Sequence, residues 1–177
     1  NMNGSNANIF DCTFTDNDVS ADGGAVYNDS SMPTLLNCTF TGNTAGDDGG
    51  AVFNADPSSS QNIPSFNRCA FTGNQAIDEG GGMHNFSVSP LIEYCEFRNN
   101  SAGEGGGILS WNSSNPRIWA TPFCGNTPTH IDGNWTDEGG NEFEDNCGSC
   151  EADLDGSSHV GVDDLLIIIA AWASDDA

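Results

Sequence analysis

The chain has 177 residues and a formal net charge of -23 at pH 7, because 26 acidic residues face only three basic side chains, all of them arginine. This balance excludes the basic surface that nucleic-acid binding requires, and it disfavours attraction to an anionic membrane. No apolar run reaches the roughly 18 residues of a membrane-spanning helix, so no membrane span is predicted. The acidity leaves two explanations open, solubility in a saline habitat or a protein that works with bound cations.

A unit of about 26 residues recurs five times along the chain. In each copy a phenylalanine is followed three residues later by an asparagine, and successive phenylalanines are 26, 31, 26 and 26 residues apart. The five pairs are Phe14 and Asn17, Phe40 and Asn43, Phe71 and Asn74, Phe97 and Asn100, and Phe123 and Asn126. A fixed period of this length predicts stacked units that bury their apolar faces only against one another.

Each copy contains the pattern of two short strands and a corner. Polar and apolar residues alternate around the phenylalanine, as in residues 39–41, which is typical of a strand with one face turned inward. Paired glycines such as Gly49 and Gly50 then supply a sharp turn, and residues 51–53 indicate a second strand. Coils of two or three short strands, stacked about 4.8 Å apart, form a parallel β-helix. We therefore predict an all-β fold, a right-handed parallel β-helix of about five coils.

The asparagine of each copy is expected at a corner of its coil. Stacked side-chain amides there would form a ladder, hydrogen-bonded from coil to coil. An ordinary turn-forming role for the same asparagines is the alternative. The five additional residues before Phe71 are placed within residues 55–64, as a loop that bulges from one corner.

Four acidic residues beside the glycine corners also align with the repeat. They are Asp22, Asp48 and Glu79, eight residues after the phenylalanine, and Glu104, one place earlier. Stacked carboxylates about 5 Å apart repel by about 1 kcal/mol in water and about 3 kcal/mol at an effective dielectric constant of 20. A bound divalent cation would reverse this cost, whereas water and salt would screen it at a solvated corner. These acids are therefore candidate cation ligands.

Four of the seven cysteines form a column two residues before the phenylalanines: Cys12, Cys38, Cys69 and Cys95. Their expected spacing of about 4.8 Å allows the disulfides Cys12–Cys38 and Cys69–Cys95. Free buried thiols are the favoured alternative, because the interior of a β-helix needs small stacking groups. The other three cysteines lie outside the column, and one disulfide is expected among them.

The motif F-x-x-N followed by G-G-[A/G]-[V/I/M] resembles the repeats of polymorphic outer-membrane proteins and related secreted β-helix adhesins, over roughly residues 1–135. This resemblance implies a surface or extracellular binding or scaffold protein whose repeat carries no catalytic residue. The cysteine content, the start at Asn1 without Met and seven N-x-S/T sequons fit a processed, secreted chain. The sequons, which are candidate glycosylation sites, are Asn3, Asn28, Asn37, Asn85, Asn99, Asn112 and Asn134.

Residues 153–172 resemble one calcium-loop-plus-helix half of a dockerin. The resemblance places calcium ligands of the EF-hand type at Asp153, Asp155, Ser157, His159 through its backbone carbonyl, and Asp164, with Gly161 acting through water. Ser157 and Ser158 stand where an acidic residue and a glycine are usual, which predicts weak affinity for Ca²⁺. The second half of a dockerin is missing. The helix that follows, residues 165–172, is apolar all round and needs burial on every side.

The sequence thus predicts three parts: a β-helix over residues 1–136, an acidic cysteine-containing linker or cap over 137–152, and the calcium loop and apolar helix over 153–177. We expect a secreted structural protein without enzymatic activity, a calcium-dependent filament or surface-layer subunit that polymerises head to tail. In that assembly the apolar helix would pack on the next chain, the alternative being its own last coil.

The alternative function is a monomeric surface adhesin or dockerin-anchored module with a surface glycan or protein partner. A polysaccharide lyase or hydrolase is less favoured, because the arginines Arg68, Arg98 and Arg117 occupy different columns and the acidic clusters adjoin no aromatic platform.

Overall fold

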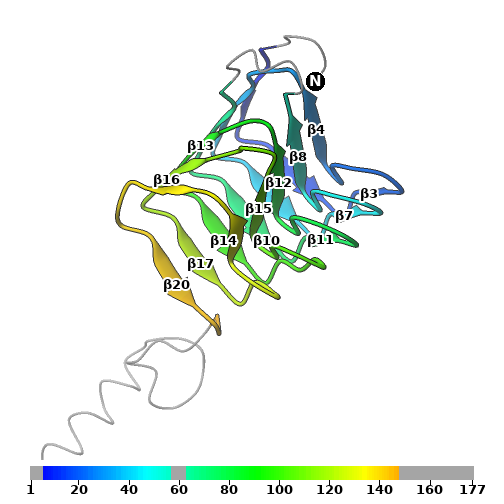
Figure 1. Cartoon of the computed structure of the whole chain (residues 1–177). Coiled ribbons are helices and arrows are strands. Elements are labelled where there is room, and N and C mark those ends of the chain that lie inside the picture. The colour runs from blue at the N-terminus through cyan, green and yellow to red at the C-terminus, as the bar shows by residue number, and fades with distance from the viewer. Residues whose placement is uncertain (1–5, 57–62, 148–177) are drawn as a thin grey trace, which may run out of the picture. The chain divides into compact units, whose positions relative to one another are not determined.

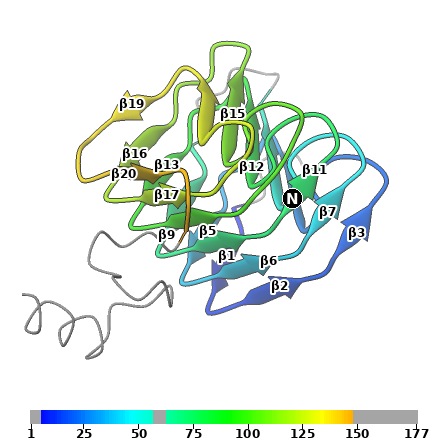
Figure 2. The ribbon, with the colours of Figure 1, turned by 90° about the horizontal axis from the view of Figure 1, so that it is seen from below.

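The computed structural model describes residues 6–56 and 63–147, and their chain winds into a right-handed parallel β-helix (Figures 1 and 2). Short strands of successive coils pair in parallel and in register, which builds four sheets along the axis. Residues Asn1–Phe143 form one compact unit and Glu144–Ala177 a second. In the part of the chain that the structure describes, no helix is long and apolar enough to cross a membrane.

Two sheets run through all coils. In the first sheet the strands are β1 (Asn8–Phe10), β5 (Thr34–Leu36), β9 (Ser65–Asn67), β13 (Leu91–Glu93), β16 (Arg117–Trp119) and β19 (Thr136–Asp137). In the second sheet they are β2 (Thr13–Thr15), β6 (Thr39–Thr41), β10 (Ala70–Thr72), β14 (Glu96–Arg98), β17 (Pro122–Cys124) and β20 (Glu142–Glu144). A corner joins these two sheets in each coil, and Figure 2 shows their strands stacked coil upon coil.

Two further sheets complete each coil. The third sheet is short and contains β3 (Asp18–Val19), β7 (Thr44–Ala45) and β11 (Gln75–Ala76). The fourth sheet contains β4 (Val26–Asp29), β8 (Val52–Ala55), β12 (Met83–Phe86), β15 (Ile108–Trp111) and β18 (Ile131–Gly133). The glycine corners connect the third sheet to the fourth. The loop predicted within residues 55–64 falls between β8 and β9, and its residues 57–62 lie outside the described residues.

The interior is a set of stacked columns with one residue from each coil. The repeat phenylalanines stack face to face, with ring centroids 4.8, 4.8, 4.4 and 5.1 Å apart from Phe14 to Phe123. These separations equal the spacing of paired strands, so in-register pairing by itself brings the rings into contact. Leu35, Phe66, Ile92 and Ile118 form a second column without solvent exposure. The predicted fold, with its phenylalanines stacked inside, is confirmed.

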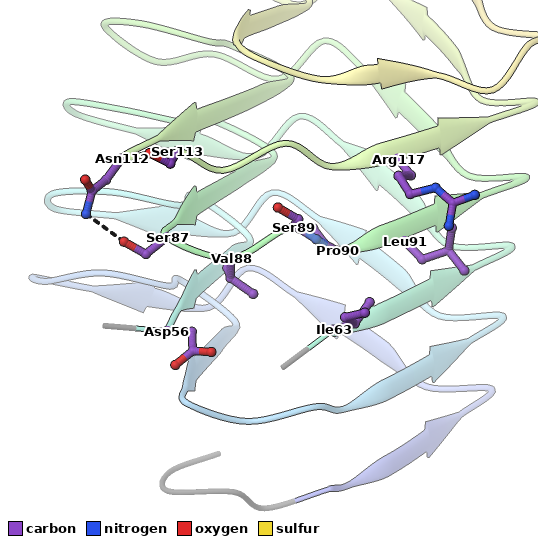
Figure 3. A pocket seen from close by; sticks show the side chains of 10 residues that line it. All are labelled: Asp56, Ile63, Ser87, Val88, Ser89, Pro90, Leu91, Asn112, Ser113 and Arg117. Carbon is purple, nitrogen blue, oxygen red and sulfur yellow. Dashed lines mark hydrogen bonds between the residues drawn. The ribbon is translucent and has the colours of Figure 1, made fainter. Parts of the chain in front are cut away.

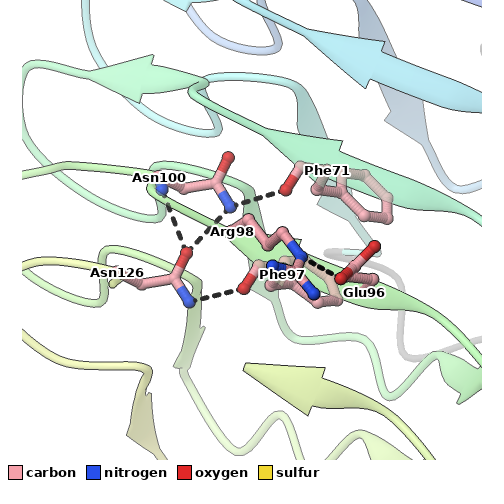
Figure 4. A network of polar contacts seen from close by, with 6 residues as sticks. All are labelled: Phe71, Glu96, Phe97, Arg98, Asn100 and Asn126. Atoms are coloured by element: carbon pink, nitrogen blue, oxygen red, sulfur yellow. Dashed lines mark hydrogen bonds and ion pairs between the residues drawn. The ribbon is translucent and has the colours of Figure 1, made fainter. Parts of the chain in front are cut away.

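The asparagine ladder is also confirmed (Figure 4). The backbone N–H and side-chain Nδ2 of Asn74 both donate to Oδ1 of Asn100, at 2.9 Å each. Asn100 makes the same two bonds to Asn126, and its Nδ2 also donates to the carbonyl oxygen of Phe71. Each buried amide therefore links three consecutive coils, and its polar atoms are satisfied without water.

The β-helix continues beyond the predicted boundary at residue 136. Strand β19 pairs with β16 and strand β20 follows β17, so part of the predicted linker adds a sixth, incomplete turn. Phe143 stacks on Phe123 with centroids 5.2 Å apart. The sequence held a signal for this turn, since Phe143 and Asn146 repeat the F-x-x-N motif, but their spacing of 20 residues from the preceding pair departs from the period.

The cysteine column consists of free thiols. Cys38, Cys69 and Cys95 are buried, and each Sγ donates weakly to backbone carbonyl oxygens at 3.4–3.6 Å. The favoured alternative, small buried fillers, therefore describes this column, and the two geometrically allowed disulfides are not formed. Outside the column, Cys124 and Cys147 are disulfide-bonded, as expected for that group.

Candidate functional site

The glycine corners bring the predicted acidic residues into one column. Backbone N–H groups of Gly23, Gly49 and Gly80 donate to the carbonyl oxygens of Asp48, Glu79 and Glu104, respectively, at 2.8–2.9 Å. Asp48 also donates its backbone N–H to Oδ1 of Asp22 at 3.3 Å. The alignment of Asp22, Asp48, Glu79 and Glu104 therefore holds in the structure. We call this stack of turns the acidic corner.

The acidic corner lies directly against the outer face of the fourth sheet. Gly80 has φ of +66°, and a Cβ added there would lie 2.6 Å from the carbonyl oxygen of Met83 and 2.8 Å from Cβ of His84. Both the left-handed backbone and this close approach require glycine. The paired glycines thus do more than turn the chain, because they allow the corner to cover the side chains of β8 and β12.

His84 is the polar member of the column that the corner covers. In the register of the fourth sheet it follows Tyr27 and Phe53 and precedes Leu109. The His84 side chain is only 2% exposed, and its ring lies edge-on to Phe53 at 5.0 Å. Neither ring nitrogen has a hydrogen-bond partner among the described residues. An unsatisfied buried polar group costs about 1–3 kcal/mol, so this histidine needs an explanation.

The Nδ1 atom of His84 lies close to two carboxylates of the acidic corner. Nδ1 lies 3.3 Å from Oδ2 of Asp48 and 3.7 Å from Oε2 of Glu79, outside hydrogen-bonding geometry. The three side chains offer one nitrogen and two carboxylate oxygens, all within 4.8 Å of one another. Of the four predicted acids, the structure thus joins two to a histidine that the sequence reasoning missed. The sequence signal that could have found His84 is its position in the repeat, because the two preceding copies carry the aromatic residues Tyr27 and Phe53 there.

Burial raises the pKa of two carboxyl groups at the corner. For Asp22 desolvation is the largest cause, and repulsion from Asp48 and Asp47 adds to it. For Glu79 desolvation again comes first, followed by an opposing attraction to His84 and by repulsion from Asp48, Glu104 and Asp78. Negative charge at this corner is therefore destabilised, and a cation bound there would relieve the repulsion.

The predicted calcium loop, with Asp153, Asp155, Ser157, His159 and Asp164, lies outside the described residues, as does the sequon at Asn3. Asn37, Asn99, Asn112 and Asn134 are exposed sequons.

Two sequons do not suit glycan attachment in the folded chain. Asn28 and Asn85 are at most 1% exposed. They belong to a second amide ladder, in which Nδ2 of Asn28 donates to Asn54 and Nδ2 of Asn54 donates to Asn85. Since Nδ2 is the atom that carries a glycan, burial makes these two asparagines structural. Their common place, 14 residues after the repeat phenylalanine, was the overlooked signal.

The three arginines do not converge on a site. The Arg68 guanidinium lies 5.6 Å over the ring of Tyr94, and Arg98 is ion-paired with Glu96. Arg117 donates from Nε to Glu138 at 2.7 Å, and this partner raises the pKa of its guanidinium. Such pairing favours structural roles for these side chains.

A pocket of about 700 Å³ opens beside Arg117, between the fourth and first sheets (Figure 3). Ile63, Val88 and Leu91 give it apolar surface, and Ser87 and Asn112 give it polar groups that are hydrogen-bonded to each other at 2.6 Å. The pocket therefore combines an apolar floor with hydroxyl, amide and guanidinium groups at its rim.

The chain belongs to the family described as the right handed beta helix region, whose family model matches residues 1–127. That match covers the phenylalanine and asparagine pair of all five copies. No curated protein and no solved structure matches the chain.

Proposed function

We propose that this chain is a secreted structural subunit whose copies stack end to end along the β-helix axis. The observation that carries the proposal is the open first coil. Strands β1, β2, β3 and β4 pair only with the strands of the second coil, and no described residue pairs with their other edge. Unpaired edges of this kind recruit strands from other chains unless they are covered.

The side chains at this end favour the same reading. Phe14 and Ile9 are only half-buried, whereas Phe40 and Leu35, which follow them in the same columns, are 0% exposed. At the other end of the phenylalanine column, Phe143 is 46% exposed. A head-to-tail contact that places Phe143 of one copy on Phe14 of the next would continue one aromatic column through both chains. Such contacts do not close on themselves and therefore produce filaments.

Calcium is the proposed regulator of this stacking. Subunits with a charge of -23 repel one another, and at the acidic corner burial, with repulsion between neighbouring acids as a smaller cause, raises the pKa of Asp22 and of Glu79. The resemblance of residues 153–164 to a dockerin loop adds a further place for Ca²⁺. Bound cations would lower the repulsion between chains.

The test compares the two ends of the column in the full-length chain. Phe14→Asp and Phe143→Asp place a charge on the stacking surfaces, and Thr13→Asp places the same charge on an exposed outward position of the same strand as Phe14. With calcium, we expect wild type and Thr13→Asp to form filaments in electron micrographs and fast-sedimenting species, and both Phe variants to remain monomeric. Circular dichroism checks the fold of each variant.

Removal of calcium with a chelator should disperse the filaments. A wild type that remains entirely monomeric at high concentration with calcium would refute the assembly proposal. Filaments that form equally well from the Phe14→Asp variant would place the contact elsewhere.

A monomeric surface adhesin is the second candidate, and the pocket beside Arg117 is what favours it. Its mixture of apolar floor and polar rim suits a sugar ring. Binding to a glycan array that is lost in Asn112→Ala, with a wild type that stays monomeric, would support this alternative.

A further inference from the structure

We propose that Asp48, Glu79 and His84 form a binding site for a transition-metal dication of the zinc class. This inference is independent of the stacking of chains. It rests on two observations of different kinds. Two carboxylates converge at one corner, and a buried histidine with no hydrogen-bond partner among the described residues places its Nδ1 3.3 and 3.7 Å from their oxygen atoms.

The nature of the three donors selects the metal. Ca²⁺ and Mg²⁺ are bound through oxygen, so a site with an imidazole nitrogen disfavours them. Zn²⁺ and its neighbours accept imidazole together with carboxylate ligands, with affinity rising toward Cu²⁺ and remaining high for Zn²⁺. The acidic corner therefore differs from the oxygen-only calcium loop that the resemblance places at residues 153–164.

The spacing of the donors fits one ion. Ligand atoms held about 2.1 Å from a tetrahedral ion lie about 3.4 Å apart. Nδ1 of His84 is 3.3 Å from the Asp48 oxygen and 3.7 Å from the Glu79 oxygen. Since Asp48 and Glu79 are 25% and 29% exposed, an ion could enter from solvent and keep water at its remaining position. The two carboxylate oxygens lie within 4.8 Å of each other, so side-chain rotation would bring them together on the ion.

The column around His84 argues that packing does not require a histidine there. The same place is filled by Phe53 one coil earlier and by Leu109 one coil later, both at most 8% exposed. An apolar side chain would fill it without leaving buried nitrogen atoms unsatisfied. A metal ligand explains the exception, because coordination satisfies Nδ1 and offsets the charges of the two carboxylates.

The site would act as a clamp between coils. Asp48 belongs to the corner before β8, whereas Glu79 and His84 belong to the next coil, on the corner before β12 and on β12 itself (Figure 1). An ion shared by the two coils binds only when they are stacked in register. Binding of this kind stabilises the native state by linkage.

The experiment titrates Zn²⁺ into the full-length chain, prepared without a polyhistidine tag and with Ca²⁺ in excess to fill oxygen-only sites. His84→Leu is the test variant, because Leu109 shows that leucine suits the column. Asp47→Asn is the matched control, since it removes an exposed charge from the same corner but no ligand. Thiols bind Zn²⁺ as well, so the readout is the difference between variants in bound equivalents, measured by equilibrium dialysis.

We expect His84→Leu to bind one equivalent fewer than wild type and Asp47→Asn to bind as many as wild type. Zn²⁺ should raise the melting temperature of wild type more than that of His84→Leu. Co²⁺ should shift the His84 ring signals in the NMR spectrum.

If His84→Leu does not fold, the double variant Asp48→Asn/Glu79→Gln replaces it as the test variant. We expect this double variant to bind one equivalent of Zn²⁺ fewer than wild type. Equal binding of Zn²⁺ by wild type and by a folded ligand variant would overturn the proposal. His84 ring signals that Co²⁺ leaves unshifted would also overturn it.

Discussion

Replacement of Asn74 by alanine tests whether the amide ladder holds the coils together. Asn74 lies at the centre of the ladder and is 0% exposed. Its Oδ1 accepts the backbone N–H and the Nδ2 of Asn43, at 3.0 and 2.9 Å. Its Nδ2 donates to Oδ1 of Asn100 at 2.9 Å and to the carbonyl oxygen of Phe40 at 3.1 Å. The substitution therefore removes four buried hydrogen bonds.

The magnitude follows from the four hydrogen bonds that are lost. Asn43 Nδ2 keeps its bond to Phe14, Asn100 Oδ1 keeps the backbone N–H of residue 74, and Phe40 stays in the strand pair of β6 and β10. A hydrogen bond of this kind contributes a net of about 0.5–1.5 kcal/mol, so we expect Asn74→Ala to lower the free energy of unfolding by about 2–6 kcal/mol.

Equilibrium unfolding in urea, followed by circular dichroism and tryptophan fluorescence, measures this loss. Asn17→Ala is the matched control. Its side chain is the exposed end of the same ladder and makes one bond, from Nδ2 to Asn43. Water replaces that bond, so the control should lose less than about 1 kcal/mol. Equal losses in the two variants would refute the view that the buried amides carry the stability of the stack.

Two further predictions concern the interior and the acidic corner. Phe71→Ala removes a fully buried ring stacked on Phe40 and Phe97, and it should lower the free energy of unfolding by about 3–5 kcal/mol in the same assay. Phe143 is half-exposed, so Phe143→Ala should lower it by less than about 2 kcal/mol. Similar losses in the two variants would contradict continuous burial along the column. Glu79→Gln, measured with a chelator, tests the raised pKa of that carboxyl. A carboxyl whose pKa is raised on folding contributes stability below its ordinary value of 4.5 and loses it as the pH rises. Wild type should therefore lose stability relative to the glutamine variant between pH 4 and pH 7. If wild type gains stability instead, attraction to His84 outweighs the burial of Glu79 and its repulsion from the neighbouring acids.

The sequence alone determined the architecture of this protein, because a coil of a β-helix is a local object with a fixed length. The recurring phenylalanine and asparagine fixed the register, and parallel in-register pairing then places equal residues above one another. The phenylalanine stack, the ladder through Asn74 and the alignment of the corner acids all follow from that one relation.

What covers a residue on its side of the sheet was decided only by the tertiary structure. His84 was overlooked because the glycine corner of its own coil folds back over it, through a close approach at Gly80 that a linear pattern does not reveal. Asn28 and Asn85 have the sequence of glycosylation sites, yet neighbouring coils enclose their amides. The last turn, at Phe143, does not follow the period of about 26 residues, because the chain that connects it to Phe123 is shorter. A repeat fixes which residues stack, whereas burial and charge depend on how separate turns of the chain fold over one another.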